Sequence, residues 1–232
     1  MKKLLLIVLW APLLAVGAEA GYRLDPSPHD VTDLVSLQAG AKTYVNYCLG
    51  CHGAQYMRYN RLTELGLTDE QIRDNLLFTA DKVGETMKTP MEAKAGKQWF
   101  GVAPPDLSVV ARSRGADWLY TYLRTFYRDP KTVTGWNNAV FENVAMPHAL
   151  WMLQGEQGYD REKGRFTEIS KGSLSRVEYD MAVRDLVNFL VYMGEPAVQR
   201  RKAIGIWTVL ILLGLLFPLT YWLKKEYWKD VK

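Results

Sequence analysis

Cysteine is scarce in this chain of 232 residues: Cys48 and Cys51 are the only two, and there are three histidines. A closed structural zinc site takes four nitrogen or sulfur ligands, so His29 and His148 would have to complete it. A thiol–disulfide redox pair is typical of a thioredoxin-like βαβ pattern, which this sequence lacks. The composition therefore argues against two common uses of a Cys-x-x-Cys pair.

The body of the chain also lacks an excess of positive charge, although the whole chain has a formal net charge of +4. Between residues 21 and 199, 20 Lys and Arg stand against 22 Asp and Glu, a net charge of −2. Nucleic-acid binding, which the overall charge would suggest, loses its support. A body of about 180 residues fits one domain with a sizeable core.

What the sequence does contain is Cys48-Leu49-Gly50-Cys51-His52. Two cysteines two residues apart, followed directly by a histidine, are the attachment signature of a c-type haem. The two thiols add to the vinyl groups of the porphyrin as thioethers, and a helix that starts at this turn is expected to direct the imidazole to the iron. The motif predicts one covalent haem c, held by Cys48 and Cys51, with His52 as an axial iron ligand.

Each end of the chain carries an apolar segment. Residues 1–20 combine a short positive start, an apolar stretch and a final Ala18-Glu19-Ala20, which predict a secretory signal peptide cleaved after Ala20. Residues 204–223 carry no charge, and at about 1.5 Å per residue they form a helix roughly as long as a bilayer is thick. We therefore predict a periplasmic domain at 21–199, one transmembrane helix at 204–223 and a cytoplasmic tail at 224–232.

Between these ends the pattern predicts a mainly α fold with long loops. Two capping boxes predict helix starts, one after Thr68 and one after Ser175, the second helix ending at Gly194. Apolar spacing predicts a helix at 31–47, and aromatic content predicts another at 118–127. A high content of Gly and Pro predicts a loop at 79–107, and a segment rich in Gly and charged residues predicts a hairpin at 155–173.

The iron needs a second axial ligand opposite His52, and methionine is the usual one in electron-transfer cytochromes c. Met146 is favoured because Pro147 ends regular structure beside it. On spacing alone, Met87, Met91 and His148 together remain as good a choice. Of the other methionines of the domain, Met57 is too close to His52 in the sequence to reach the opposite face of the haem. Packing positions are expected for Met152, Met181 and Met193.

The assembled features resemble the cytochrome c1 family, the haem subunit of the ubiquinol–cytochrome c oxidoreductase complex (complex III), in a bacterial form. The resemblance covers nearly the whole mature chain and implies a class I cytochrome c-like haem domain with long loop insertions plus one C-terminal transmembrane helix. An acidic insertion of the longer mitochondrial members is not obvious here, so their acidic docking patch is not carried over. Besides the haem motif, the resemblance rests on 37–41, 56–62, Pro104-Pro105-Asp106-Leu107-Ser108, Ala145-Met146-Pro147 and the C-terminal helix with its anchor.

The resemblance also implies roles for individual residues. The methionine before the proline is the sixth ligand in this family, which selects Met146. Pro105 falls where a proline packs on the histidine side of the haem, and Trp118 falls where an aromatic ring approaches it. The arginine near a haem propionate is Arg112 or Arg114, and Arg114 is favoured.

By resemblance the chain is an electron-transfer subunit and no enzyme by itself. It would take electrons from a Rieske iron–sulfur protein and pass them to a soluble or membrane-bound cytochrome c, with its C-terminal helix in the lipid bilayer against cytochrome b. The complex is expected to be dimeric and to lie in the bacterial inner membrane, with the haem domain on the periplasmic side. Two alternatives stay open: a free-standing membrane-anchored monohaem shuttle, and a haem enzyme with an open distal site.

Overall fold

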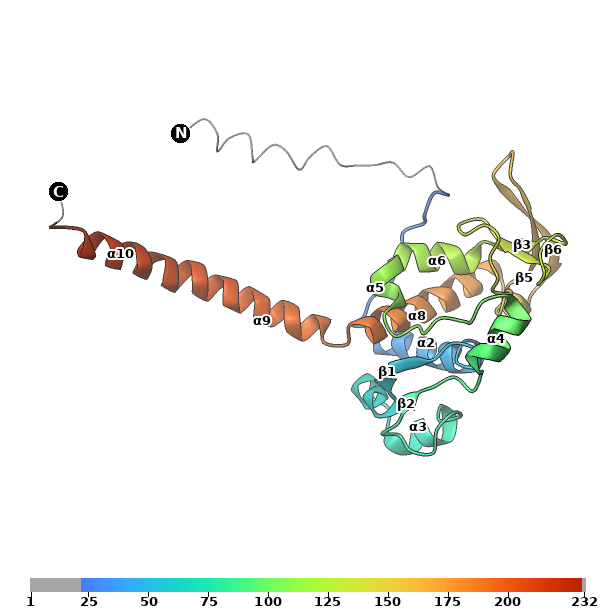
Figure 1. Ribbon diagram of the computed structural model, residues 1–232, viewed down its shortest axis with the longest axis horizontal. Coiled ribbons are helices and arrows are strands. Elements are labelled where there is room, and N and C mark those ends of the chain that lie inside the picture. The colour runs from blue at the N-terminus through green and yellow to red at the C-terminus, as the bar shows by residue number, and fades with distance from the viewer. Residues whose placement is uncertain (1–21, 231–232) are drawn as a thin grey trace.

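Figure 1 shows a domain built of helices and short hairpins, from which one long helix extends toward the C-terminus. The computed structural model describes residues 22–230, so the predicted signal peptide at 1–20 lies outside the described residues. The mainly α fold class is confirmed. In chain order the elements are α2 (Leu34–Tyr47), β1 (Ala54–Arg58), η2 (Tyr59–Leu65), α3 (Asp69–Asn75), β2 (Thr86–Met87), α4 (Ala93–Phe100), α5 (Val110–Arg114), α6 (Ala116–Arg124), β3 (Phe126–Arg128), β4 (Trp136–Asn138), α7 (Trp151–Gln154), β5 (Gly155–Asp160), β6 (Arg165–Lys171), α8 (Arg176–Gly194), α9 (Val198–Ile211), η3 (Leu212–Leu216) and α10 (Phe217–Tyr227).

The core of the domain lies where α2 crosses α8. Leu37 and Tyr44 of α2 and Leu186 and Phe189 of α8 are almost completely buried. Gly40 stands at the crossing itself, where a Cβ atom would lie 2.0 Å from the carbonyl oxygen of Asp185. The two backbones can approach this closely only because residue 40 has no side chain.

The helix starts follow their capping residues. Both predicted capping boxes are present: Thr68 and Gln71 open α3, and Ser175 and Glu178 open α8. The helix expected from residue 31 begins instead at Leu34, because the Asp33 side chain accepts a hydrogen bond from the amide of Ser36. Such N-caps fix where a helix can begin.

The strands of the described residues form three antiparallel pairs. β3 with β4 and β5 with β6 are hairpins, whereas η2 and α3 separate β1 from its partner β2. The predicted hairpin at 155–173 is confirmed by β5 and β6, which project from the domain in Figure 1. The predicted helix at 118–127 ends earlier, at Arg124, and the chain continues as β3.

The loop predicted at 79–107 was wrong in one part, since it contains the helix α4. Gly96 lies in this helix and is buried, and a Cβ there would come within 2.6 Å of the Pro104 ring. Glycine is a poor helix former, so its presence lowered the helical expectation. Here it is required by close packing of α4 on the chain that follows.

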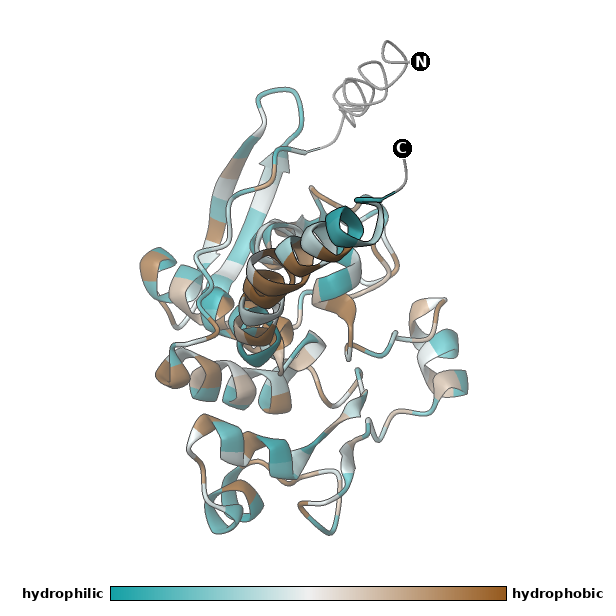
Figure 2. Ribbon diagram, turned by 90° about the vertical axis from the view of Figure 1, so that its left-hand side faces the viewer, coloured by the Kyte–Doolittle hydropathy of each residue, from teal (hydrophilic) through white to brown (hydrophobic). Residues whose placement is uncertain are grey.

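The long C-terminal helix runs from Val198 to Tyr227 and contains the predicted span 204–223, and an 18-residue stretch of it has a mean hydropathy of 2.2. Figure 2 shows its apolar residues in brown as the helix is viewed almost end-on. Leu212–Leu216 form a π-helical segment just before Pro218. Proline lacks an amide hydrogen and crowds the carbonyl four residues earlier, and a π turn is one way to absorb both effects. Within residues 22–230 this is the one helix long and apolar enough to cross a membrane.

Candidate haem site

The haem motif forms a turn at the C-terminal end of α2. Cys48 caps the helix, and the amide of His52 donates to the carbonyl of Cys48 at 2.8 Å. The hydroxyl of Tyr44 donates to the carbonyl of His52 at 2.8 Å, which ties the end of the turn back to α2. The expectation that a helix starts at this turn was wrong: the motif closes α2, because the chain leaves it as β1, which pairs with β2.

The two thiols are half-buried. Burial raises the pKa of Cys48 to about 12 and also raises that of Cys51. Redox-active Cys-x-x-Cys pairs need the opposite, a lowered pKa that yields a reactive thiolate. The surroundings therefore give no support to the redox-pair interpretation.

The imidazole of His52 is oriented by one hydrogen bond. Its Nδ1 atom lies 2.7 Å from the carbonyl oxygen of Pro105, a group that can only accept, so Nδ1 carries the proton. Burial lowers the pKa of His52, partly opposed by that bond, and so favours a neutral ring. A neutral imidazole protonated on Nδ1 leaves the lone pair of Nε2 available to a metal.

The loop that carries Pro105 is tied to the chain after the haem motif. The two carboxylate oxygens of Asp106 accept from the amides of Gln55, at 2.9 Å, and Ser108, at 2.8 Å. The amide of Leu107 donates to the carbonyl of Gly53 at 2.8 Å. Sequence reasoning gave Asp106 no role, although Asp two residues before Ser is a recognisable turn signal.

Met146 contacts α6 through its sulfur. The hydroxyl of Tyr122 donates to Sδ of Met146 at 3.4 Å. Tyr122 in turn stacks on Trp118, with ring centroids 4.6 Å apart and planes 12° from parallel. Sequence reasoning missed Tyr122, which lies 24 residues from its partner.

The rival side chains occupy other surroundings. Met87 is fully buried on β2, and the Sδ atom of Met91 lies against Gly96 of α4. His148 is buried, stacked 4.9 Å from Phe126, and burial lowers its pKa to about 4. The expected packing positions hold for Met193 but were wrong for Met152 and Met181, which are 55% and 44% exposed.

The two candidate arginines point to different neighbours. The guanidinium carbon of Arg114 lies 5.2 Å from the ring centroid of Trp118 and 5.9 Å from that of Phe141. The side chain of Arg112 instead lies against Gly194, at the end of α8. Of the two, Arg114 therefore shares a cluster with Trp118, Tyr122 and Met146.

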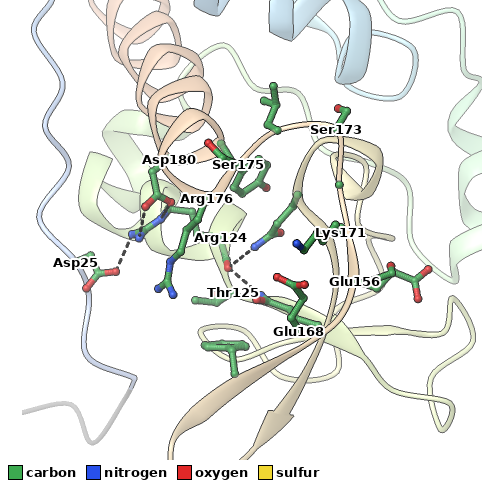
Figure 3. Close-up of a pocket in the computed structure, with 18 of the residues that line it drawn as sticks. Asp25, Arg124, Thr125, Glu156, Glu168, Lys171, Ser173, Ser175, Arg176 and Asp180 are labelled. Carbon is green, nitrogen blue, oxygen red and sulfur yellow. Dashed lines mark hydrogen bonds and ion pairs between the residues drawn. The ribbon is translucent and has the colours of Figure 1, made fainter.

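A cavity of about 550 Å³ lies elsewhere, between residues 22–25, the end of α6, the start of α8 and the β5–β6 hairpin (Figure 3). Arg124 crosses it and pairs with Asp25 at 2.8 Å and Asp180 at 2.6 Å. None of the predicted haem residues is among its lining residues. The cavity thus belongs to the packing of the N-terminal segment rather than to the haem motif.

The side chains at the motif fit a c-type haem. Two uncharged thiols, an imidazole with a free Nε2 and a thioether are the groups that attach and ligate such a haem. Cys48, Leu107, Val110, Trp118 and Met146 are partly buried and border the same apolar core. The zinc alternative lacks further ligands, since the described part of the chain holds no group of three or more His, Cys, Asp and Glu side chains placed to bind a metal.

A mainly α domain with a Cys-x-x-Cys-His turn and one apolar C-terminal helix defines a membrane-anchored c-type cytochrome. The model of the cytochrome C1 family matches residues 26–231, and the chain belongs to this family. A cytochrome c1 of Allochromatium vinosum is 46% identical over the full length of both chains. The mitochondrial cytochrome c1 haem protein of Saccharomyces cerevisiae is 26% identical over 88% of this chain and 70% of its own.

One relative bears a different name. A protein of Nitrosomonas europaea named ammonia monooxygenase gamma subunit is 50% identical over 99% of this chain and 98% of its own. The shared stretch is the one that matches the cytochrome c1 family, so the monooxygenase name is not carried over. As a cytochrome c1, the chain is a haem-containing electron-transfer subunit of the quinol–cytochrome c reductase complex, together with cytochrome b and the Rieske protein, and no catalyst by itself.

Proposed function

We propose that this cytochrome c1 holds one haem covalently through Cys48 and Cys51, with His52 and Met146 as axial ligands, and passes electrons from the Rieske protein to a soluble or membrane-bound cytochrome c. The observation that carries the proposal is the hydrogen bond from His52 Nδ1 to the Pro105 carbonyl. It leaves Nε2 as the ligating atom directly after the attachment cysteines. A haem bound there would supply the ferric–ferrous couple that carries one electron, which the side chains of the chain do not supply.

Met146 is the proposed second ligand because its sulfur is already held on the side of α6 that carries Trp118 and Tyr122. Met87, Met91 and His148 each have surroundings that explain them as packing residues. Thioether ligation in an apolar site favours the reduced state and raises the reduction potential. With both axial positions taken by the chain, no position is open for a substrate, which disfavours the haem-enzyme alternative.

Pro105 and Trp118 are proposed to flank the haem, and Arg114 to meet a propionate. Arg114 lies over the Trp118 ring, which supports its choice over Arg112. A guanidinium on an aromatic face keeps its hydrogen-bond donors free at the edge for a carboxylate. Pro105 contributes through its carbonyl group, which orients His52.

The domain is proposed to lie on the periplasmic side of the bacterial inner membrane, in a dimeric complex. The predicted signal peptide and the apolar helix Val198–Tyr227 support this arrangement. Lys224 and Lys225 follow the predicted span and would lie on the cytoplasmic side. Membership in the cytochrome c1 family favours a fixed complex over a free-standing shuttle.

The proposal is tested on the full-length protein in detergent. Haem staining of the denatured polypeptide reports covalent attachment, and the absorption spectrum of the oxidised protein reports a methionine–iron charge-transfer band. Met146→Leu preserves volume, so it should cost less than about 1.5 kcal/mol of folding free energy. It should nevertheless abolish the band and lower the reduction potential, whereas His148→Ala should keep the band.

Two results would contradict this assignment. An unstained wild-type polypeptide would rule out covalent attachment through Cys48 and Cys51. A band that survives in Met146→Leu but is lost in Met87→Leu, Met91→Leu or His148→Ala would move the sixth ligand to that residue.

A further inference from the structure

We propose that Tyr122 is a positioning residue for Met146, and that the hydrogen bond from its hydroxyl to the thioether sulfur raises the reduction potential of the cytochrome. This inference rests on the proposed ligation by Met146. The oxygen–sulfur distance is 3.4 Å, which is within hydrogen-bonding range for a sulfur acceptor. The Cys-x-x-Cys-His motif itself does not require a tyrosine at this place.

The backbone of Tyr122 is fixed by a neighbouring hairpin. Its carbonyl oxygen accepts from the side-chain amide of Asn138 at 2.7 Å, and Asn138 is completely buried on β4. The carbonyl also accepts from the backbone amide of Thr125, at the end of α6. The residue that holds the sulfur is therefore anchored to two elements.

The ring of Tyr122 is fixed as firmly as its backbone. Trp118 stacks on one side at 4.6 Å, and Phe126 meets it edge-on at 5.0 Å. Aromatic contacts of this kind set the plane of a ring. The hydroxyl can therefore leave Met146 only if this aromatic cluster rearranges.

A hydrogen bond to a ligating sulfur changes its electron donation. The hydroxyl withdraws electron density from the thioether, so the sulfur stabilises the electron-poor oxidised iron less than it otherwise would. The reduced iron depends less on that donation, so the equilibrium between oxidised and reduced iron moves toward the reduced state. Met146 is only partly buried, so its sulfur could otherwise turn toward water. The hydrogen bond from the phenol opposes that rotation.

Tyr122→Phe removes only the hydroxyl and keeps the ring in the cluster. The matched control is Tyr179→Phe, because Tyr179 is a buried tyrosine of α8 whose hydroxyl donates to the carbonyl of Leu123 at 2.8 Å. Both variants lose one hydrogen bond of a buried tyrosine, but only the bond of Tyr122 ends on Met146. A general loosening of the fold would affect both.

The measurement is a redox titration of the full-length holoprotein, with the charge-transfer band recorded in the oxidised state. Tyr122→Phe should change the ratio of oxidised to reduced protein at a fixed ambient potential about threefold toward oxidised, which equals a midpoint about 28 mV lower at 59 mV per tenfold. The band should persist at a shifted wavelength. Tyr179→Phe should keep the wild-type potential and band.

An unchanged potential in Tyr122→Phe, or an equal shift in Tyr179→Phe, would overturn the inference. Met146→Leu separates this failure from failure of the proposed function. If that variant loses the band while Tyr122→Phe matches wild type, only the role of Tyr122 is wrong. If Met146→Leu keeps the band, the ligand assignment is wrong and the role of Tyr122 falls with it.

Discussion

Asp106 helps to orient His52 without contacting it. It touches neither the imidazole nor the cysteines, yet its two oxygens accept from the amides of Gln55 and Ser108. These bonds hold the Pro105 carbonyl, one residue earlier, against the ring of His52. The Pro-Pro-Asp-Leu-Ser motif thus has a physical reason for its acidic residue.

Asp106→Ala should destabilise the domain by roughly 1–3 kcal/mol, because two backbone amides lose their acceptor. It should also lower the fraction of chain that carries haem, since His52 is less well oriented. Urea unfolding and the ratio of haem to protein measure the two effects. Asp81→Ala, at an exposed position in another loop, serves as the control and should change neither.

Single residues differ in how far the sequence predicts them. Cys48, Cys51 and His52 are expected from spacing alone, because the chemistry of attachment requires that spacing. Tyr122 could not be predicted as the partner of Met146, since their contact depends on how α6 and the β3–β4 hairpin fold together. Arg112 and Arg114 are two residues apart; resemblance favoured Arg114, and the contacts of the two side chains add a physical reason for that choice.

At the scale of elements, the crossing of α2 and α8 shows how a small residue sets the distance between helices. Gly40→Ala would place a Cβ 2.0 Å from the Asp185 carbonyl and 2.7 Å from Cβ of Phe189. Because backbone atoms must move, we expect a loss of folding free energy at or above the roughly 1–3 kcal/mol usual for overpacked cores. The midpoint of thermal unfolding is the readout.

Gly84→Ala is the matched control, because no atom lies within 4 Å of a Cβ built there. It should unfold within a degree or so of wild type, as surface changes of roughly 0.5 kcal/mol or less do. Equal unfolding temperatures for Gly40→Ala and wild type would show that α2 and α8 can separate without cost.

Elements with a local start signal were predicted well, and those defined by packing were not. The capping boxes at Thr68 and Ser175 gave α3 and α8, because the side chains that cap a helix lie within four residues of its start. The helix α4 was not predicted, because Gly96 indicates a break in a helix. In the structure a glycine is needed at this position so that α4 can pack closely on Pro104. The helix that leads into the haem turn was predicted, but a second helix expected after the turn is replaced by β1, because the pairing of β1 with β2 is not encoded within the motif.

On the scale of the whole molecule, the chain divides into a domain and a helix that packs little against it. None of the apolar stretch of Val198–Tyr227 is buried by the domain. A chain that ends at Gln199 should therefore fold, take up haem and show the wild-type spectrum, but appear in the soluble fraction. Membrane fractionation followed by haem staining measures this.

The full-length chain is the control and should stay with the membrane after a carbonate wash. A truncated chain that also stays in the membrane would mean that residues 1–20 are retained as an anchor. That result would contradict the predicted signal peptide and leave the haem site unaffected.

The connection between α8 and α9 is only Glu195–Ala197. The amide of Glu195 donates to the carbonyl of Val191, and the amide of Val198 donates to the carbonyl of Glu195, so Glu195 is bonded to both helix ends. Arg201 of α9 pairs with Glu195 across the joint. A domain on a long flexible linker can carry an electron from one partner to the next, but the linker between α8 and α9 is too short for such movement. We infer that a haem in this domain stays at one height above the bilayer, so the proteins proposed to exchange electrons with it must move instead.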